Sequence, residues 1–251
     1  FSNRSDKELL SLLSHPNQRV RQNAQFELAG RGDKVVDALA KLAKGGKSIH
    51  SRLHAVWALG NIQAQAHKAG RDLQAGELDP VLAVIGDSDP HLRSAAARVL
   101  GNAAYPPAYD ALIQRTQDKD AQVAATATIA LGKLQRRESI PAVFAVLEAN
   151  ADRDPFVRHA AVQALVTIGD FDALLASAKH PSAAVRMGVL LAMRRLERHE
   201  IALFLRDSDP RLVLEAARAI NDMPISGAMI DLAEMIGTLG PDSNPALARR
   251  V

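Results

Sequence analysis

One pattern recurs seven times along the 251-residue chain and limits what the chain can fold into. The first residue of each copy, called position 0, is Arg in five copies and Ala or Val in two: Arg21, Arg52, Arg93, Ala124, Arg158, Arg186 and Val213. Position +3 is Ala in six copies, as in RLHAVWAL and RSAAARVL, and position +7 is always aliphatic or Met. Positions 0, +3, +4 and +7 share one side of a helix, so every copy predicts an amphipathic α-helix.

The residues ahead of each copy also match. The sixth residue before position 0 is Asp87, Asp118, Asp152 or Asp207 in four copies, and in three of them this Asp begins a DSDP or DRDP sequence. Asp, Ser and Asn cap helix N-termini, and Pro fits the first helical turn. A shorter apolar stretch precedes each turn, so a unit reads as helix, capped turn, helix. One such unit cannot bury its apolar stripe alone, whereas a stack of units can.

The pattern resembles the short bacterial form of the HEAT-repeat family over about residues 6–236, most clearly in DSDPHLRSAAARVLG. The resemblance implies an all-α fold, and we expect a right-handed α-solenoid of about seven HEAT-like helix pairs. It also implies that Asp and Arg form a ladder between neighbouring repeats, which would include Asp87, Arg93, Asp152 and Arg158. Ala124 and Val213 replace the expected Arg, so the ladder should break there.

We expect one solenoid domain over residues 1–251 that is a fragment of a larger protein. An insertion, Gln63 to Glu77, lengthens the spacing between the second and third copies. It is polar and contains Gly70 and Gly76, so it predicts a loop, either slack or used for binding. The predicted repeats are residues 6–32, 33–62, 78–102, 107–135, 139–169, 171–197 and 199–223, with a partial unit at 224–251.

A narrower resemblance rests on LLSHPNQRVRQNAQFELAGRGD, DRDPFVRHAAVQAL and NPALARRV. These segments are similar to the HEAT segment of large exported bacterial proteins, in which a sugar-dehydrogenase-like propeller precedes the helices and a c-type cytochrome follows. The resemblance implies a periplasmic or exported location, although the composition also allows a cytoplasmic one. The parent protein would then be an oxidoreductase.

Composition narrows the function. The chain has no cysteine, which excludes disulfides and thiolate metal sites. A net charge of +3 does not require a nucleic-acid partner. No apolar run approaches the roughly 18 residues of a membrane span, so we expect no membrane insertion.

We found no sequence signature of catalysis. Nucleophile elbows, Walker loops and G-x-G-x-x-G are absent. His50 and His54 are four residues apart, a spacing that can bind a metal, but no third ligand is evident. We therefore predict no catalytic residue, no cofactor and no metal, and expect that this segment is not an enzyme.

The only tryptophan, Trp57, marks the candidate binding surface. It occupies position +5, about 140° around the helix from position 0, and Phe26 holds +5 in the preceding repeat. In a HEAT stack the second helices line the concave surface, where aromatic, Arg and Asn side chains favour binding. The alternative is that Phe26 and Trp57 are covered and belong to the core. The candidate protein-binding residues are Phe26, His54, Trp57, Asn61, Arg98 and Asn102.

These observations favour a non-catalytic scaffold that binds protein, either other domains of the same chain or a separate protein. The alternative is a nucleic-acid-binding solenoid resembling the HEAT-like alkylpurine DNA glycosylases. That function would need a basic face, whereas Arg98 and Arg218 are mixed with Glu215 and Asp222. A chromophore-lyase-like HEAT protein is a third class, but no specific residue of the sequence supports it.

Overall fold

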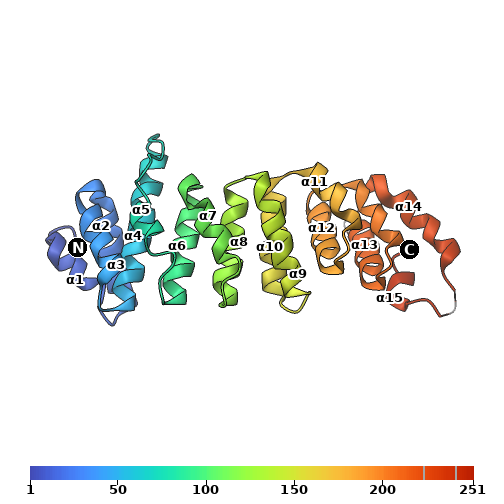
Figure 1. Cartoon of the computed structure of the whole chain (residues 1–251), viewed down its shortest axis with the longest axis horizontal. Coiled ribbons are helices and arrows are strands. Elements are labelled where there is room, and N and C mark those ends of the chain that lie inside the picture. The colour runs from blue at the N-terminus through green and yellow to red at the C-terminus, as the bar shows by residue number, and fades with distance from the viewer. Residues whose placement is uncertain (223, 241) are drawn as a thin grey trace. The chain divides into compact units, whose positions relative to one another are not determined.

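The computed structural model describes residues 1–222, 224–240 and 242–251, and all regular structure among them is helical (Figure 1). The predicted all-α solenoid fold is therefore confirmed. The chain divides into two compact units, Phe1–Leu134 and Gln135–Val251, which are described separately. The single domain over residues 1–251 stays a prediction.

The first unit contains four helix pairs in which each first helix packs on the second, and the second helices pack on one another in succession. Short 3-10 helices, η1 (Gly32–Val35) and η2 (Pro106–Ala108), lead into two of the first helices. The pairs are α1 (Asp6–Leu12) with α2 (Gln18–Gly30), α3 (Val36–Gly45) with α4 (Ile49–Lys68), α5 (Asp79–Leu82) with α6 (Pro90–Asn102), and α7 (Tyr109–Arg115) with α8 (Ala121–Lys133).

The second unit continues the alternation with less regular first helices. Its second helices are α10 (Pro155–Ile168), α12 (Ala183–Arg195) and α13 (Pro210–Asp222), and α12 contacts both of the others. The remaining elements are η3 (Arg137–Ser139), α9 (Ile140–Asn150), α11 (Phe171–Ala176), η4 (Ser177–Lys179), η5 (His199–Arg206), η6 (Ser226–Ala228), α14 (Met229–Glu234), η7 (Met235–Thr238) and α15 (Pro245–Ala248).

The core of each unit is the predicted stripe. Every residue at position +3 is 0% exposed, and every residue at +7 is at most 3% exposed. Small side chains at +3 let successive second helices approach closely. The approach is close at Gly101 of α6, where an added Cβ would lie 2.6 Å from the Cα of Ala130 in α8.

The two aspartates of each DSDP turn have different tasks. Asp89 caps α6, because its carboxylate accepts a hydrogen bond from the His91 N–H at 2.8 Å. Asp87 accepts the Asp89 N–H at 3.0 Å and also pairs with Arg52 of the preceding repeat. The turn sequence thus ends one helix pair and joins it to its neighbour.

The Asp–Arg ladder is best developed at Arg93. Its Nε and Nη2 donate to the Asp118 carboxylate of the next repeat at 2.8 and 2.7 Å, and its Nη1 donates to the carbonyls of Asp87 and Ser88. Burial acts to raise the pKa of Asp118, but hydrogen bonds from Arg93 and the Asp120 N–H outweigh it, and the pKa is lowered. Asp87 and Arg93 therefore each link two repeats, with Arg52 and Asp118 as their respective partners.

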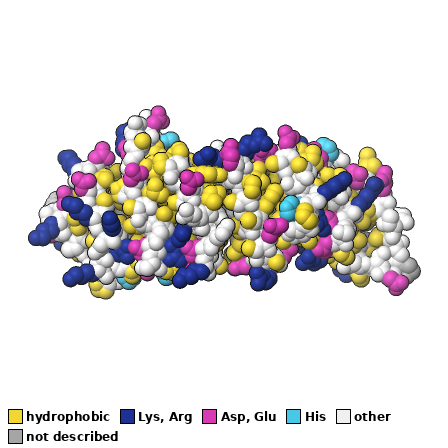
Figure 2. Space-filling view, viewed as in Figure 1, with side chains coloured by type: hydrophobic (Ala, Val, Ile, Leu, Met, Phe, Trp, Pro, Cys, Tyr) yellow, Lys and Arg dark blue, Asp and Glu magenta, His cyan; other side chains and the backbone are white. Residues whose placement is uncertain are grey.

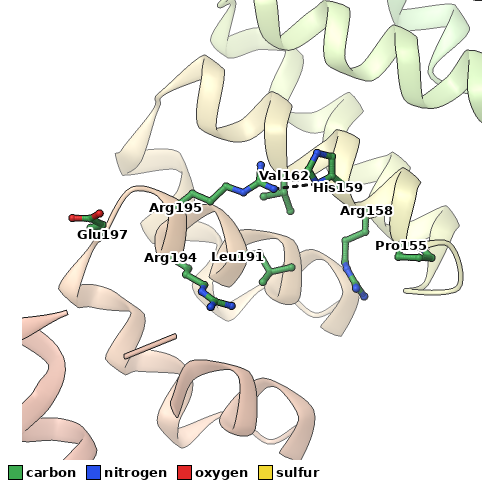
Figure 3. Close-up of a pocket in the computed structure, with 8 residues that line it drawn as sticks. All are labelled: Pro155, Arg158, His159, Val162, Leu191, Arg194, Arg195 and Glu197. Carbon is green, nitrogen blue, oxygen red and sulfur yellow. Dashed lines mark hydrogen bonds between the residues drawn. The ribbon is translucent and has the colours of Figure 1, made fainter. Parts of the chain in front are cut away.

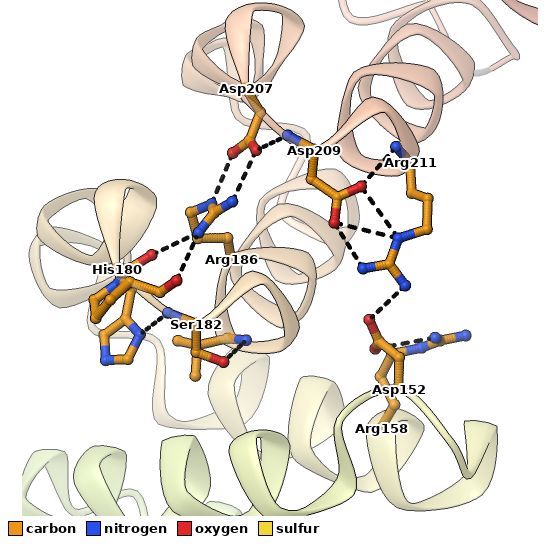
Figure 4. A network of polar contacts seen from close by, with 10 residues as sticks. Asp152, Arg158, His180, Ser182, Arg186, Asp207, Asp209 and Arg211 are labelled. Atoms are coloured by element: carbon orange, nitrogen blue, oxygen red, sulfur yellow. Dashed lines mark hydrogen bonds and ion pairs between the residues drawn. The ribbon is translucent and has the colours of Figure 1, made fainter.

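The prediction that Asp152 and Arg158 form the ladder between neighbouring repeats is wrong. Arg158 pairs with Asp152 of its own repeat at 3.2 Å, while Arg186 and Asp207 keep the regular inter-repeat arrangement (Figure 4). The reason lies in the neighbours. Ala124 stands where the Arg partner of Asp152 would be, and His180 stands where the Asp partner of Arg158 would be.

The insertion is not a loop throughout. Residues 63–68 continue α4, because Gln, Ala and Lys are good helix formers and the first glycine comes only at Gly70, whose φ is +79°. Arg71 then pairs with Glu77. The Tyr105 hydroxyl accepts the Gly76 N–H at 3.0 Å and donates to Asp79 at 2.6 Å. The end of the insertion is thus held by a hydrogen bond to Tyr105, which follows α6.

Candidate protein-binding surface

Five of the six candidate residues line one groove of about 390 Å³ across α2, α4 and α6 of the first unit. They are Phe26, Trp57, Asn61, Arg98 and Asn102, and we call this surface the Phe26–Trp57 face. The geometry follows from the repeat, because +5 and +9 point away from the buried stripe on successive second helices. That the face binds a partner stays a prediction.

The two aromatic side chains are the apolar part of this face. Phe26 is 57% exposed and Trp57 is 36% exposed. Both also line a second groove, on the side of α2 and α4 that carries Gln18 and His50. Phe26 and Trp57 therefore stand between two depressions, and neither is a fully buried core residue.

The prediction that His54 lies on the exposed face is wrong: His54 does not line the Phe26–Trp57 groove, and at the second groove it contributes a largely buried side chain. It is only 3% exposed, because position +2 of α4 packs against α2. Arg21 Nε donates to His54 Nε2 at 3.1 Å, and His54 Nδ1 lies 2.7 Å from Gln25 Oε1. Gln25 in turn donates to Asn61 at 2.7 Å. Position −6 of the next repeat is a glycine, Gly46, so Arg21 has no ladder aspartate and uses His54 instead.

This buried network keeps His54 neutral. Burial, followed by the nearby charges of Arg21 and His50, lowers the pKa of His54 to about 4. A neutral ring can accept from Arg21 at Nε2 and donate to Gln25 from Nδ1. The imidazole also makes a T-shaped contact with the indole of Trp57, with ring centroids 5.0 Å apart and planes at 86°. His54 is thus a support beneath Trp57.

Arg21 and Gln25 are the participants that sequence reasoning missed. Gln25 occupies +4, where other repeats have Val56, Ala97 or Thr128, so a buried amide in an otherwise apolar or small series was the available signal. Its partner across the helices could be found only from the packing.

The polar rim of the face is supplied by α4 and α6. Arg98 and Asn102 are exposed, and Asn61 is half-buried. Lys133 of α8 donates to Asn102 at 2.5 Å. On the side shown in Figure 2, basic and acidic side chains are interspersed over each unit and do not gather into one basic field.

His50 and His54 are the pair whose spacing could suit a metal ion. Among the residues the structure describes, no group of three or more His, Asp or Glu side chains could hold an ion. In the same residues, no helix is both long and apolar enough to cross a membrane.

Comparison with known proteins now gives the family. The family model of HEAT repeats matches residues 7–76, 52–123 and 109–194, which together span well over half of the chain. The chain belongs to the HEAT-repeat family.

One curated relative is the deoxyhypusine hydroxylase of Gallus gallus, 34% identical over 108 residues. The match covers 42% of this chain and 36% of the relative, so it spans about a third of that protein's length.

Two solved structures show the same fold. The Escherichia coli protein YibA has a TM-score of 0.55 at 17% identity, over 99% of this chain and 92% of its own. The complex of CpcE and CpcF of phycocyanin lyase from Nostoc sp. PCC7120 has a TM-score of 0.51 at 17% identity, over 94% and 96%. At this identity the likeness concerns the fold alone.

The expectation that the segment is not an enzyme is contradicted by the hydroxylase relative. That expectation rests on the absence of nucleophile and nucleotide-binding motifs. A relative that is itself an enzyme shows that these motifs are a poor guide in this family, because side chains from separate helices can assemble a site without any local signature. The narrower resemblance to exported dehydrogenase and cytochrome proteins is not shown by these comparisons.

Proposed function

We propose that this chain is a protein–protein interaction module or interdomain scaffold, and that the Phe26–Trp57 face is its docking surface. The observation that carries the proposal is the pair of adjacent aromatic side chains, 57% and 36% exposed, on a grooved face of successive second helices. Aromatic and Arg side chains dominate the binding energy of protein interfaces, and Arg98 lines the same groove.

The contacts beneath the Phe26–Trp57 face hold its tryptophan in place, so this part of the surface is ordered before a partner binds. Trp57 makes a T-shaped ring contact with His54, and His54 is held by Arg21 and Gln25. Fixing an aromatic anchor before the partner arrives lowers the entropy cost of association, about 0.5–1.5 kcal/mol for each side chain already ordered. A slack surface would lack this advantage.

Nucleic-acid binding remains the less favoured alternative. It calls for a row of free cations. In the second unit, Arg218 lies 3.4 Å from Glu215 and 3.9 Å from Asp222, and Arg194 lies 2.8 Å from Glu215. Carboxylates thus neutralise part of the positive charge that such a function would need.

The narrower assignment, to the HEAT module of a large exported dehydrogenase- or cytochrome-type protein, rests on the sequence segments alone. Its periplasmic or exported location rests on the same segments. The reading frame of the parent gene tests both: a C-x-x-C-H sequence downstream of Val251 supports the assignment, and a frame without propeller or haem sequences contradicts it.

Site-specific photocrosslinking tests the docking surface. A benzophenone amino acid replaces Phe26 in the chain expressed in its own organism, and a matched variant carries it at Leu203 of η5, which is 51% exposed in the second unit. We expect a discrete crosslinked product from position 26 and none from position 203. A product within one chain identifies another domain, and a heavier product identifies a separate protein. Equal, diffuse crosslinking at both positions would contradict the proposal.

A further inference from the structure

We propose that a groove between α10 and α12 of the second unit binds a carboxylate-bearing, acidic peptide segment of a partner protein. This site is separate from the Phe26–Trp57 face and does not rest on it. The groove measures about 520 Å³ (Figure 3). It is lined by Pro155, Arg158, His159, Val162, Leu191, Arg194, Arg195 and Glu197.

The charge of the lining is the first argument. The lining contains three guanidinium groups and one carboxylate, and that carboxylate, Glu197, points away from the other labelled side chains in Figure 3. Arg158 and Arg194 already have acidic partners, Asp152 at 3.2 Å and Glu215 at 2.8 Å. These pairs hold the two side chains in place at the groove but satisfy only part of each five-donor fork.

Arg195 is the residue left for a ligand. In the part of the chain that the structure describes, no ion pair includes it. Its guanidinium donates to Gln163 Oε1 at 3.0 Å and lies 3.0 Å from His159 Nδ1. Neither an amide oxygen nor an imidazole ring carries a negative charge. They orient the fork on the exposed surface and leave its charge uncompensated.

The floor of the groove explains why a peptide fits better than a nucleic acid. Val162 and Leu191 lie between the arginines, and Pro155 closes one end. Next to Pro155, Phe156 is 81% exposed, the largest exposure among the large apolar residues of the described chain. The aliphatic floor and the cationic rim together suit a peptide in which Glu or Asp alternates with aliphatic residues. Single-stranded nucleic acid favours Phe, Tyr or Trp side chains in the groove for base stacking, and the lining has none of these.

The sequence carried a weak sign of this site. Leu191 and Arg195 occupy +5 and +9 of their repeat, the same positions as Trp57 and Asn61 in the first unit. Each unit therefore presents the outward positions of its second helices, with an aromatic surface in one and a cationic groove in the other.

Fluorescence anisotropy tests the proposal on the full 251-residue chain. The probe is a fluorescein-labelled peptide of alternating Glu and Leu, compared with the same peptide carrying Gln for Glu. We expect the Glu peptide to bind, and the Gln peptide to bind at least about tenfold more weakly, because charge-assisted hydrogen bonds to Arg are lost. Arg195→Gln should weaken the Glu peptide by at least about tenfold, and Arg195→Lys by less, since Lys keeps the charge but not the fork.

The matched control is Arg206→Gln, which removes the same charge from the second unit at a side chain that is 83% exposed and outside the groove. It should leave the affinity unchanged. Equal weakening by Arg206→Gln and Arg195→Gln would reduce the effect to bulk charge and overturn the proposal. So would equal binding of the Gln peptide, failure of the Glu peptide to bind, or preference for a single-stranded oligonucleotide over the peptide. Circular dichroism of each variant checks that the helices are intact.

Discussion

Arg93→Ala should be among the most damaging single substitutions in the first unit, although Arg93 is a charged residue. Its side chain and that of Asp118 are 5% and 4% exposed, so the pair is nearly free of solvent. The substitution removes two hydrogen bonds to the Asp118 carboxylate and two to the carbonyls of Asp87 and Ser88. It also leaves a carboxylate in the space between two repeats.

The magnitude follows from the burial. Breaking a buried pair by removing one partner costs about 3–5 kcal/mol, because the remaining charge is uncompensated. Arg115 lies 3.3 Å from Asp118 and offsets part of this loss. We therefore expect a decrease of about 3 kcal/mol in the free energy of unfolding, or a factor on the order of 100 in the equilibrium constant.

Arg158→Ala is the matched control. Arg158 holds the same position in its repeat, but its side chain is 30% exposed and makes one 3.2 Å contact with Asp152 of the same repeat. Exposed pairs contribute about 0–1 kcal/mol, so this variant should be close to the parent protein.

Urea unfolding followed by circular dichroism measures both variants, and hydrogen exchange shows where protection is lost. Arg93→Ala should lose protection in α6 and α8 and retain it in α12 and α13. If the two variants lose equal stability, or if Arg93→Ala is as stable as the parent, the account of the ladder is refuted.

Three further predictions follow from the packing of the first unit. Gly101→Ala should lower the unfolding free energy by about 1–3 kcal/mol, because the new Cβ would overlap a backbone atom of α8. Its control, Gly30→Ala, has open space around the new Cβ and should be neutral or stabilising by up to about 1 kcal/mol. Thermal melts of both variants measure the difference, and equal melting temperatures would contradict the close approach. Because the pKa of His54 falls from 6.5 to about 4 on folding, the unfolded chain binds a proton between these pH values and the folded chain does not, so stability should drop by about 3 kcal/mol as the pH falls through this window. Urea titrations of the parent and of His54→Gln check this, and a parent protein whose stability does not fall further than the variant's would contradict it. Phe26→Ala should cost less than about 1 kcal/mol and Trp57→Ala about 2 kcal/mol, in proportion to their burial, with iodide quenching of the tryptophan as an independent measure of its partial exposure; complete protection from iodide would contradict the exposed face.

Sequence periodicity was sufficient for the fold, because position +3 and position +7 must be apolar in every repeat for the stack to form. Ala96 and Leu100, for example, are both 0% exposed. The same periodicity placed Phe26 and Trp57 on the outward side. Which positions of a helix are apolar and which point outward depends on that helix alone, so one sequence is enough to predict it.

Properties that depend on two helices were harder to predict. Helix geometry alone predicts that His54 points outward, but position +2 of α4 packs against α2, and Arg21, which lacks its aspartate, donates to the buried imidazole. Asp152 and Arg158 pair within one repeat because their expected partners are Ala124 and His180. In both cases an exception in one repeat determines the contacts in the next, and a pattern averaged over copies hides it.

The most direct test of the docking surface uses the partner recovered by crosslinking at position 26. Isothermal titration calorimetry measures how tightly that partner binds the parent chain and two variants. Phe26→Ala removes an anchor of the Phe26–Trp57 face, and Leu203→Ala removes an exposed apolar side chain of the second unit. An anchor in a protein interface contributes about 2 kcal/mol or more, so Phe26→Ala should weaken binding by about 30-fold or more, and Leu203→Ala should leave it unchanged. Equal affinities for all three correctly folded proteins would show that the Phe26–Trp57 face is not the docking surface.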